Sequence, residues 1–190
     1  MDIYLIRHTK PLIEPGICYG ISELELAPTF NEELKVLKAK TRGVNNLKII
    51  SSPLKRCTIL ANEFAPQAFL PDNRLLEMNF GEWENLPWLD IMDKYQDYYK
   101  KWEVEYVNLP PPGGETFSQL YKRCSGLMDE LINTADGNYA LITHGGVIRA
   151  LIAHILDLPL ESAFSLGVDY NSVTKISING RMKTVQYINR

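Results

Sequence analysis

The sequence predicts an α/β fold, a three-layer sandwich in which helices cover both faces of a mostly parallel central sheet. Short apolar runs of strand type alternate along the chain with segments whose apolar residues recur at helical spacing. The runs are short and apolar, as is typical of strands that are buried on both faces. A different pattern closes the chain, where two alternating runs flank Asn179-Gly180 and predict a β-hairpin with a two-residue turn of type I′.

The first half of the chain contains two predicted strands and two predicted helices, in the order 2–7, 29–40, 47–50 and 53–65. The first helix is indicated by Leu34, Val36 and Leu37 among Glu and Lys residues. For the second helix, Ser52 is suited to be the N-cap and Pro53 to occupy the first helical position. We therefore expect this helix to begin at Pro53.

The second half of the chain contains a predicted helix over 115–135, a strand over 138–143 and a helix over 146–158. The last of these helices is apolar on nearly all sides, so we expect it to be well covered by the rest of the protein. Between the two halves, residues 85–114 show the least regular pattern and are rich in Trp, Tyr and Pro. We interpret this segment as an insertion over a pocket, within a single domain of residues 1–190.

The composition excludes several classes of protein. The net charge is −3, with no long basic block, which argues against nucleic-acid binding, and no apolar run is long enough to cross a membrane. The first strand begins directly after Met1, without the pattern of an export signal, so we expect a cytoplasmic protein. Three widely spaced cysteines favour buried thiols over a disulfide framework or a metal site. The edge of the C-terminal hairpin could pair with a second copy of the chain.

Polar residues follow three of the predicted strands: Arg7-His8-Thr9, Ser51-Ser52 and Thr143-His144. Ligands of open α/β sheets bind outside the carboxyl ends of the strands, so neighbouring strands would bring His8 and His144 to one edge. Arg56, one turn into the following helix, could lean over the same edge. Two arginines and two histidines beside a helix N-terminus form an anion site that suits phosphate.

A histidine in a phosphate site has two possible uses. The arginines could stabilise a transferring phosphoryl group, and a neutral imidazole could in addition attack phosphorus and form a phosphohistidine. The attacking nitrogen must be unprotonated, so the other ring nitrogen should donate to a carbonyl oxygen. A carboxylic acid would then protonate the departing oxygen. No cluster with the spacing of metal ligands is present in the sequence, and we expect no metal and no cofactor.

Five motifs occur in the same order as in a known family: LIRHT, SSPLKRC, LLEMNFGEWEN, PGGET and LITHGGVIRAL. They resemble the histidine phosphatase superfamily, whose fold is that of phosphoglycerate mutase. The resemblance implies that His8 is the phosphorylated nucleophile, that Arg7 and Arg56 bind phosphate, and that His144 stabilises the transferring group. It also implies that Glu77 is the proton donor and acceptor.

The resemblance further implies a set of substrate-binding residues: Thr9, Tyr19, Gly20, Glu82, Thr143 and Gly145. Glu82 competes with Glu77 for the role of general acid, because both flank Phe80-Gly81. Glu115 is interpreted as a charge at a helix start, and His154 as a structural residue of an apolar helix face. The aromatic side chains of the 85–105 segment could stack on a ring of the substrate or pack against each other.

The chain departs from the family pattern at Thr9 and Asn85, where glycine is usual. Residues 7–27 resemble the α-ribazole phosphatase branch, which dephosphorylates a precursor of the cobalamin nucleotide loop. We therefore expect a phosphatase that acts on a small phosphorylated metabolite, with α-ribazole 5′-phosphate as the first candidate. A broad-specificity phosphatase, a mutase that passes the phosphoryl group to a second hydroxyl, and a non-catalytic phosphate-binding module are the alternatives.

Overall fold

The computed structural model describes residues 1–44, 46–66, 68–134 and 137–190, and these contain a six-stranded sheet in the order β3-β2-β4-β1-β5-β6. The strands are β1 (Asp2–Arg7), β2 (Leu47–Ser51), β3 (Leu70–Pro71), β4 (Asn138–Thr143), β5 (Val173–Asn179) and β6 (Met182–Tyr187). The helices are α1 (Phe30–Lys40), α2 (Lys55–Phe64), α3 (Trp88–Lys94), α4 (Gln96–Glu105), α5 (Phe117–Thr134) and α6 (Gly145–Leu156). None of these helices is long and apolar enough to span a membrane.

The centre of the sheet is parallel. Strand β4 pairs in parallel with β1 on one side and with β2 on the other, whereas β5 and β6 add an antiparallel edge. Arg7 lies opposite Thr143, and Ser51 lies opposite Ile142. The carboxyl ends of β1, β4 and β2 therefore meet at one edge, and the predicted mostly parallel sheet is confirmed.

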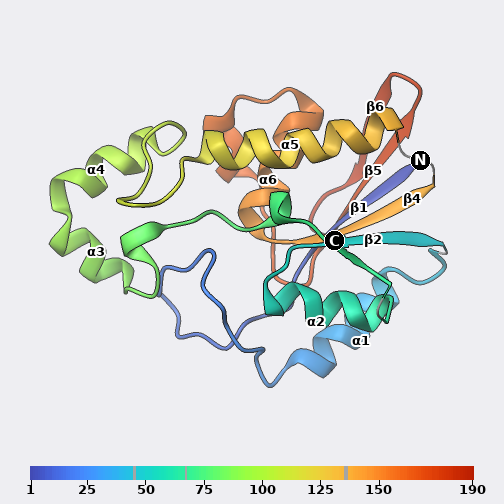
Figure 1. Cartoon of the computed structure of the whole chain (residues 1–190), viewed down its shortest axis with the longest axis horizontal. Coiled ribbons are helices and arrows are strands. Elements are labelled where there is room, and N and C mark those ends of the chain that lie inside the picture. Colours follow the sequence, from blue (N-terminus) through green and yellow to red (C-terminus); the bar gives the residue numbers. More distant parts are fainter. Residues whose placement is uncertain (45, 67, 135–136) are drawn as a thin grey trace.

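Helices cover both faces of this sheet, as predicted (Figure 1). Successive side chains of a strand point to opposite faces. On β1, Leu5 belongs to the apolar core under α5 and α6, whereas Ile6 belongs to the core under α1 and α2. Strand β4 divides in the same way, with Leu141 on the first face and Ile142 on the second. Burial on both faces explains why these strands are apolar in sequence.

The predicted start of the second helix is wrong. Helix α2 begins at Lys55 with Leu54 as its N-cap residue, not at Pro53 with Ser52 as the cap. The backbone N–H of Ser52 donates to the carbonyl oxygen of Ile142 (2.9 Å) and so continues the pairing of β2 with β4. The hydroxyl of Ser52 shares a hydrogen bond with Nε2 of His144 (2.8 Å) instead of capping a helix.

The hairpin is present, but its turn lies one residue later than predicted. Asn179 pairs with Met182, so the turn residues are Gly180 and Arg181 rather than Asn179 and Gly180. Gly180 has a φ of +59°, a conformation that glycine adopts without steric cost. The helices predicted over 115–135 and 146–158 are observed as α5 and α6, except that residue 135 lies outside the described residues.

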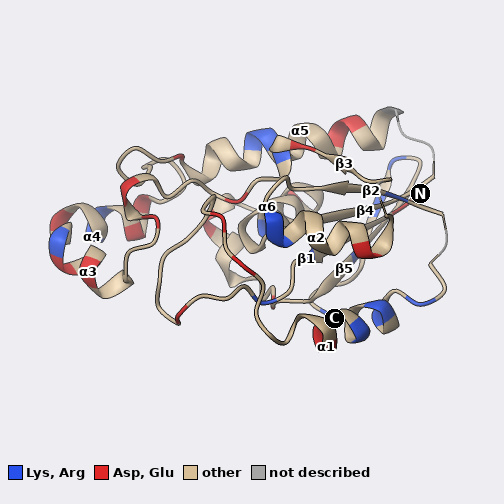
Figure 2. Ribbon diagram, turned by 60° about the horizontal axis from the view of Figure 1, so that its bottom comes forward, with Lys and Arg blue, Asp and Glu red and all other residues tan. Residues whose placement is uncertain are grey.

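The segment that looked least regular contains two helices, α3 and α4, which lie at one end of the molecule beyond the sheet (Figure 1). Acidic and basic residues are interspersed along both helices (Figure 2). Their aromatic residues pack around Trp83, which is fully buried. Its ring centroid lies 5.1 Å from that of Trp102. Charges among the aromatic residues hid the helical spacing in the sequence, and mutual aromatic packing accounts for most of these side chains.

Candidate active site

Two histidines meet at the carboxyl edge of the sheet. His8 follows β1 and His144 follows β4, and their ring centroids are 5.1 Å apart in an edge-on arrangement. Both side chains are almost completely buried. Because β1 and β4 are parallel neighbours, the proximity expected from the strand ends is observed. We call His8, His144, Arg7, Arg56 and Glu77 the histidine pocket.

One ring nitrogen of His8 is engaged by the backbone. Its Nδ1 lies 2.7 Å from the carbonyl oxygen of Thr9, which can only accept a hydrogen bond, so Nδ1 carries the proton. Burial and, to a smaller extent, Arg56 and Arg7 hold the pKa of His8 well below its usual value of 6.5. The ring is therefore neutral near pH 7, and Nε2 is left with a free electron pair, as a nucleophile requires.

His144 is held in the same neutral state. Burial, followed by the positive charges of Arg56 and Arg7 and the cost of protonating a second ring beside His8, lowers its pKa well below 6.5. Its Nε2 shares a hydrogen bond of 2.8 Å with the hydroxyl of Ser52 at the end of β2. Three neighbouring strand ends thus contribute to one site.

Arg7 is fixed by the segment between the third 3-10 helix (Leu160–Ser165) and β5. Its Nη1 donates to the carbonyl oxygen of Val168, and its guanidinium lies 3.8 Å from the ring centroid of Tyr170. The ring of Tyr170 also lies 5.6 Å from that of His8, and its hydroxyl is hydrogen-bonded to the hydroxyl of Tyr19. The Nε of Arg7 is buried and has no partner among the described residues.

Arg56 lies in the first turn of α2 and is fully buried. It donates to the carbonyl oxygens of Ser22 (2.7 Å) and Gly20, which leaves other donors of its guanidinium unused. The same loop is held from the other side by Glu84, whose carboxylate accepts from the backbone N–H groups of Gly20, Ile21 and Ser22 at 3.0–3.1 Å. A Cβ on Gly20 would collide with the carbonyl oxygen of Met78 at 1.7 Å. The loop that holds Arg56 is therefore rigidly placed.

Glu77 brings a carboxylate into the same site. Its Oε2 accepts from the N–H of Gly146 in the first turn of α6 (3.0 Å), and its Oε1 accepts from the N–H of Met78 (2.9 Å). A Cβ on Gly146 would lie 2.4 Å from Oε1, so the second glycine of the HGG sequence is required for this approach.

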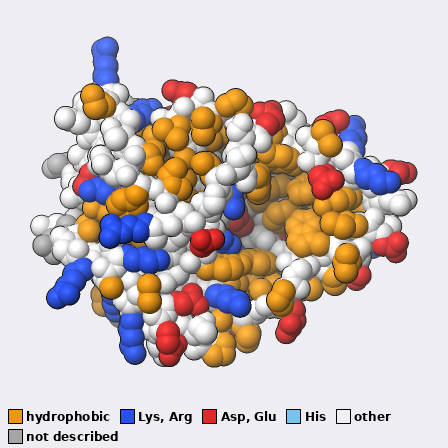
Figure 3. Space-filling model, turned by 180° about the vertical axis from the view of Figure 1, so that it is seen from behind, with side chains coloured by type: hydrophobic (Ala, Val, Ile, Leu, Met, Phe, Trp, Pro, Cys, Tyr) orange, Lys and Arg blue, Asp and Glu red, His pale blue; other side chains and the backbone are white. Residues whose placement is uncertain are grey.

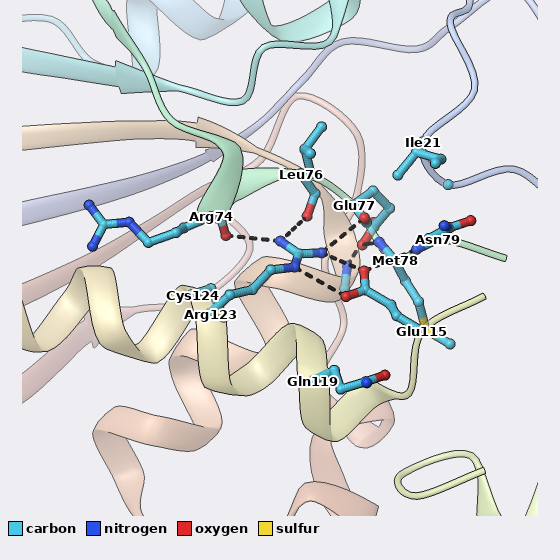
Figure 4. A network of polar contacts seen from close by, with 12 residues as sticks. Ile21, Arg74, Leu76, Glu77, Met78, Asn79, Glu115, Gln119, Arg123 and Cys124 are labelled. Carbon is cyan, nitrogen blue, oxygen red and sulfur yellow. Dashed lines mark hydrogen bonds and ion pairs between the residues drawn. The ribbon is translucent and has the colours of Figure 1, made fainter. Parts of the chain in front are cut away.

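A half-buried ion pair braces the segment that carries Glu77 (Figure 4). Arg123 of α5 donates to the carbonyl oxygens of Arg74, Leu76 and Glu77 at 2.6–3.0 Å. Its guanidinium also pairs with Glu115 at 2.6 Å, and Glu115 accepts from the N–H of Asn79 (3.0 Å). Glu115 therefore fastens the backbone beside Glu77, a role that its interpretation as a helix-start charge missed.

A cavity of about 230 Å³ opens beside His8. Its lining includes Arg7, His8, Tyr19, Glu77 and Gly145. On the face shown in Figure 3, hydrophobic side chains gather around a hollow in which basic side chains are visible. A second cavity of about 420 Å³ adjoins the first and shares four lining side chains with it, and its lining is almost entirely apolar. The shared residues are Met78, Phe80, Trp88 and Phe164.

The remaining residues predicted from the sequence, Thr143, Gly20, Glu82 and Thr9, do not line the cavity. The hydroxyl of Thr143 donates to the carbonyl oxygen of Leu75 (2.7 Å), and Gly20 lies in the loop under Arg56. Glu82 lies outside the cavity lining and accepts a hydrogen bond from the hydroxyl of Tyr95 (3.0 Å). Thr9 is fully buried, and its hydroxyl has no partner among the described residues. Of the two competing glutamates, Glu77 lines the cavity that His8 also lines.

Three residues of the site were not found from the sequence: Glu84, Arg149 and Tyr170. Glu84 and Arg149 stand inside the quoted motifs, in GEWEN and HGGVIRAL, so their position was a usable signal. Tyr170 lies 162 residues after His8, in a segment without a recognisable pattern. Asn85, where glycine is usual, has a φ of +64° and donates to the hydroxyl of Ser22 (3.0 Å). Asparagine tolerates this left-handed conformation, which explains the departure from the family pattern.

The described residues give no sign of metal or thiol chemistry. Within the described ranges, no group of three or more His, Cys, Asp or Glu side chains could hold a metal ion. The three cysteines are unpaired and buried, and burial raises the pKa values of Cys57 and Cys124 to about 12. His154 bonds to Asp129 (2.8 Å) and to the hydroxyl of Tyr121 (3.1 Å), away from the site.

A mostly parallel sheet with two neutral histidines, two arginines and a carboxylate at its carboxyl edge is an arrangement suited to phosphoryl transfer. The model of the histidine phosphatase superfamily (branch 1) matches residues 3–190, so the chain belongs to this superfamily. The predicted family and enzyme class, a phosphomonoester hydrolase, are confirmed.

Known relatives share the whole length of the chain. The adenosylcobalamin/alpha-ribazole phosphatase of Escherichia coli is 28% identical over 199 residues, which cover 100% of this chain and 96% of the relative. Phosphoserine phosphatase 1 of Hydrogenobacter thermophilus is 25% identical over 194 residues, with coverages of 100% and 92%. The crystal structure of the alpha-ribazole phosphatase of Shigella flexneri superposes with a TM-score of 0.91 at 25% identity, with coverages of 100% and 96%. The relatives are named for different substrates.

Proposed function

We propose that this enzyme hydrolyses phosphomonoesters of small metabolites through a phosphohistidine at Nε2 of His8. The observation that carries the proposal is the bond from Nδ1 of His8 to the carbonyl oxygen of Thr9 in a neutral, buried ring. That bond orients the ring and leaves Nε2 free to attack.

The reaction has two steps. In the first, the electron pair of Nε2 forms a bond to phosphorus, the ester P–O bond breaks, and Glu77 gives its proton to the departing oxygen. In the second, Glu77 takes a proton from water, the water oxygen attacks phosphorus, and the P–N bond breaks to release inorganic phosphate. The same carboxylate acts as acid and then as base, so each turnover restores both residues.

The other residues of the histidine pocket stabilise charge. Arg7 and Arg56 have unused guanidinium donors to offer the phosphoryl oxygens, and both are fixed by backbone carbonyl groups. His144 lies edge-on to His8 and supports the transferring group. Tyr19 and Gly145 line the cavity and contact the substrate, whereas Thr9, Gly20 and Thr143 act by holding these groups in place. We assign no contact with the substrate to Glu82.

Trapping of the intermediate tests this mechanism. Denaturing the enzyme during turnover of a ³²P-labelled substrate should yield a phosphoenzyme that is stable in alkali and labile in acid, as a phosphoramidate is. His8→Ala should abolish the label and lower kcat by at least about 10⁴-fold, the scale of losing a nucleophile. Full turnover by His8→Ala would exclude the mechanism. Release of inorganic phosphate without an isomerised product would distinguish the hydrolase from a mutase.

We further propose α-ribazole 5′-phosphate, the precursor of the cobalamin nucleotide loop, as a substrate. The apolar cavity next to the histidine pocket supports it, because Trp88 and Phe80 could pack against a flat aromatic base while the phosphate lies at His8. On this proposal residues 85–114 are an insertion that shapes the site for the organic part of the substrate. Three buried, unpaired thiols fit a reducing cytoplasm.

A comparison of substrates tests this assignment. The value of kcat/KM should be higher for α-ribazole 5′-phosphate than for ribose 5-phosphate, which lacks the base but carries the same phosphorylated sugar carbon. We expect a difference of about tenfold or more, the scale of stacking one base on an aromatic side chain. Equal values would show that the apolar cavity does not bind the base.

A further inference from the structure

A pair of tyrosines lies between the two arginines of the histidine pocket. The Cζ atom of Arg7 lies 3.8 Å from the ring centroid of Tyr170, and the Cζ atom of Arg56 lies 5.5 Å from that of Tyr19. The hydroxyl groups of the two tyrosines are hydrogen-bonded to each other, although 151 residues separate them in the sequence. A continuous series of contacts therefore runs from one arginine to the other.

Tyr170 is attached to the backbone that carries the nucleophile. The N–H of Arg7 donates to the carbonyl oxygen of Ser172 (3.0 Å), and the N–H of Asn171 donates to the carbonyl oxygen of His8 (3.1 Å). These two bonds join the residues that follow Tyr170 to the end of β1. The ring of Tyr170 is therefore held beside Arg7, and its centroid lies 5.6 Å from that of His8.

Tyr19 belongs to the loop that Arg56 holds. Arg56 donates to the carbonyl oxygens of Gly20 and Ser22, which follow Tyr19 closely in the sequence. Burial and, to a smaller extent, the bond to Tyr170 raise the pKa of the Tyr19 hydroxyl, so this hydroxyl stays protonated near neutral pH. The hydroxyl bond therefore joins the support of Arg56 to that of Arg7 without placing a negative charge between them.

The aromatic contact suits the task of Arg7. The negative face of a tyrosine ring attracts a guanidinium without using any of its N–H groups. Nη1 of Arg7 donates to the carbonyl oxygen of Val168, and the buried Nε has no partner among the described residues. The ring and the carbonyl group together fix the plane of the guanidinium, and the unused N–H groups are left for the phosphoryl oxygens.

We infer that Tyr170 is a positioning residue of the reaction: its ring holds Arg7 at the phosphoryl group, and its bond to Tyr19 joins the supports of Arg7 and Arg56 into one unit. The inference rests on the proposed phosphatase activity, because it assigns a role within the same site. Two arginines that are supported as one unit keep their spacing while charge moves onto the phosphoryl oxygens, as electrostatic stabilisation of a transition state requires.

Substitutions of the two tyrosines test the ring and the hydroxyl bond separately. Tyr170→Leu removes the ring, and kcat/KM for 4-nitrophenyl phosphate should fall on the order of 10- to 100-fold, the scale of a misplaced catalytic group. The inhibition constant of orthovanadate, which adopts the five-coordinate geometry of the transition state, should rise by a similar factor. Tyr19→Phe and Tyr170→Phe each remove the same hydrogen bond, so each should lower kcat/KM about two- to tenfold, and the double variant no further.

A double-mutant cycle shows whether Tyr170 acts through Arg7. In an Arg7→Ala background, Tyr170→Leu should lower kcat/KM by less than about threefold, because the group that the ring positions is already gone. Tyr187→Leu is the matched control. The ring centroid of Tyr187 likewise lies 5.5 Å from Cζ of an arginine, Arg190, but Tyr187 does not line the active-site cavity. This control should retain the kcat/KM of the wild type.

Three results would overturn the inference. Tyr170→Leu with the activity of the wild type would show that the ring positions nothing. A loss that persists in full in the Arg7→Ala background, or that Tyr187→Leu shares, would make the effect a general one on the fold. Phenylalanine variants that are fully active, or whose losses multiply in the double variant, would remove the link between the arginines, and these variants decide the matter if Tyr170→Leu does not fold. Absence of hydrolysis by the wild-type enzyme is a separate result, because it would remove the proposed phosphatase activity itself.

Discussion

The histidine pocket and the aromatic segment, residues 80–106, line two adjoining cavities but are built by opposite means. In the pocket, His8, Arg56 and Glu77 are each held by directional hydrogen bonds to the backbone. In the aromatic segment, the rings of Trp83 and Trp102 pack against each other, and their indole N–H groups are buried without a partner among the described residues. Directional bonds fix where charge and protons move, whereas ring packing fixes only a shape.

This contrast separates two kinds of effect. A change in the histidine pocket should lower the rate for every substrate, because all of them present the same phosphoryl group. A change in the aromatic segment should alter the choice among substrates and leave the chemical step in place. The two kinds are distinguished by whether the loss depends on the leaving group.

The largest effect is expected at Glu77. Glu77→Gln keeps the size of the side chain but removes the proton, and kcat for an alkyl phosphate should fall about 10²- to 10⁴-fold, the usual contribution of a general acid. The loss should be smaller for 4-nitrophenyl phosphate, whose leaving oxygen departs without a proton. Steady-state kinetics on both substrates measures the difference.

Glu82→Gln is the matched control, since Glu82 lies outside the cavity lining. Its kcat should stay within about twofold of the wild type, the range of a surface substitution away from special features. An equal loss in Glu77→Gln for both leaving groups would contradict the role of proton donor. A larger loss in Glu82→Gln would reverse the assignment of the two glutamates.

The sequence predicted the histidine pocket better than its surroundings, for a physical reason. Strand ends and helix starts are local patterns, and parallel pairing brings them together, so His8 and His144 could be placed from the strands alone. The neighbours that orient Arg7, which are Tyr170 and the carbonyl group of Val168, come from an irregular segment far along the chain. Helices α3 and α4 were missed because their stability comes from packing of aromatic residues rather than from a regular apolar stripe.

A smaller and more selective effect is expected at Trp88, which lines both cavities. Trp88→Ala should raise KM for α-ribazole 5′-phosphate by about tenfold, the scale of one aromatic contact with a base, and change that for ribose 5-phosphate much less. Trp88→Phe should retain most of the affinity. Leu89→Ala is the control, because Leu89 is the next residue and is 77% exposed. An equal rise in KM for both sugar phosphates in Trp88→Ala would contradict the proposed contact with the base.

The smallest expected effect is on the pH dependence of the free energy of unfolding. It distinguishes the histidine pocket from the aromatic segment, and its measurement needs no substrate. The folded protein holds His8 and His144 neutral, with pKa values well below 6.5. The unfolded chain takes up a proton on each histidine near pH 6.5, so acid favours unfolding. Below about pH 6.5 the free energy of unfolding should fall by up to ~1.4 kcal/mol per pH unit for each histidine, until the folded-state pKa is reached.

Urea titrations between pH 7.5 and 5.5 measure this slope. His8→Asn and His144→Asn should each remove about half of it, because each removes one of the two protons that only the unfolded chain binds in this range. Trp88→Ala should lower the free energy of unfolding by a similar amount at every pH, because the tryptophan side chain takes up no proton in this pH range. If both histidine variants kept the slope of the wild type, folding would not lower the pKa of either ring, and the buried neutral state assigned to His8 and His144 would be wrong.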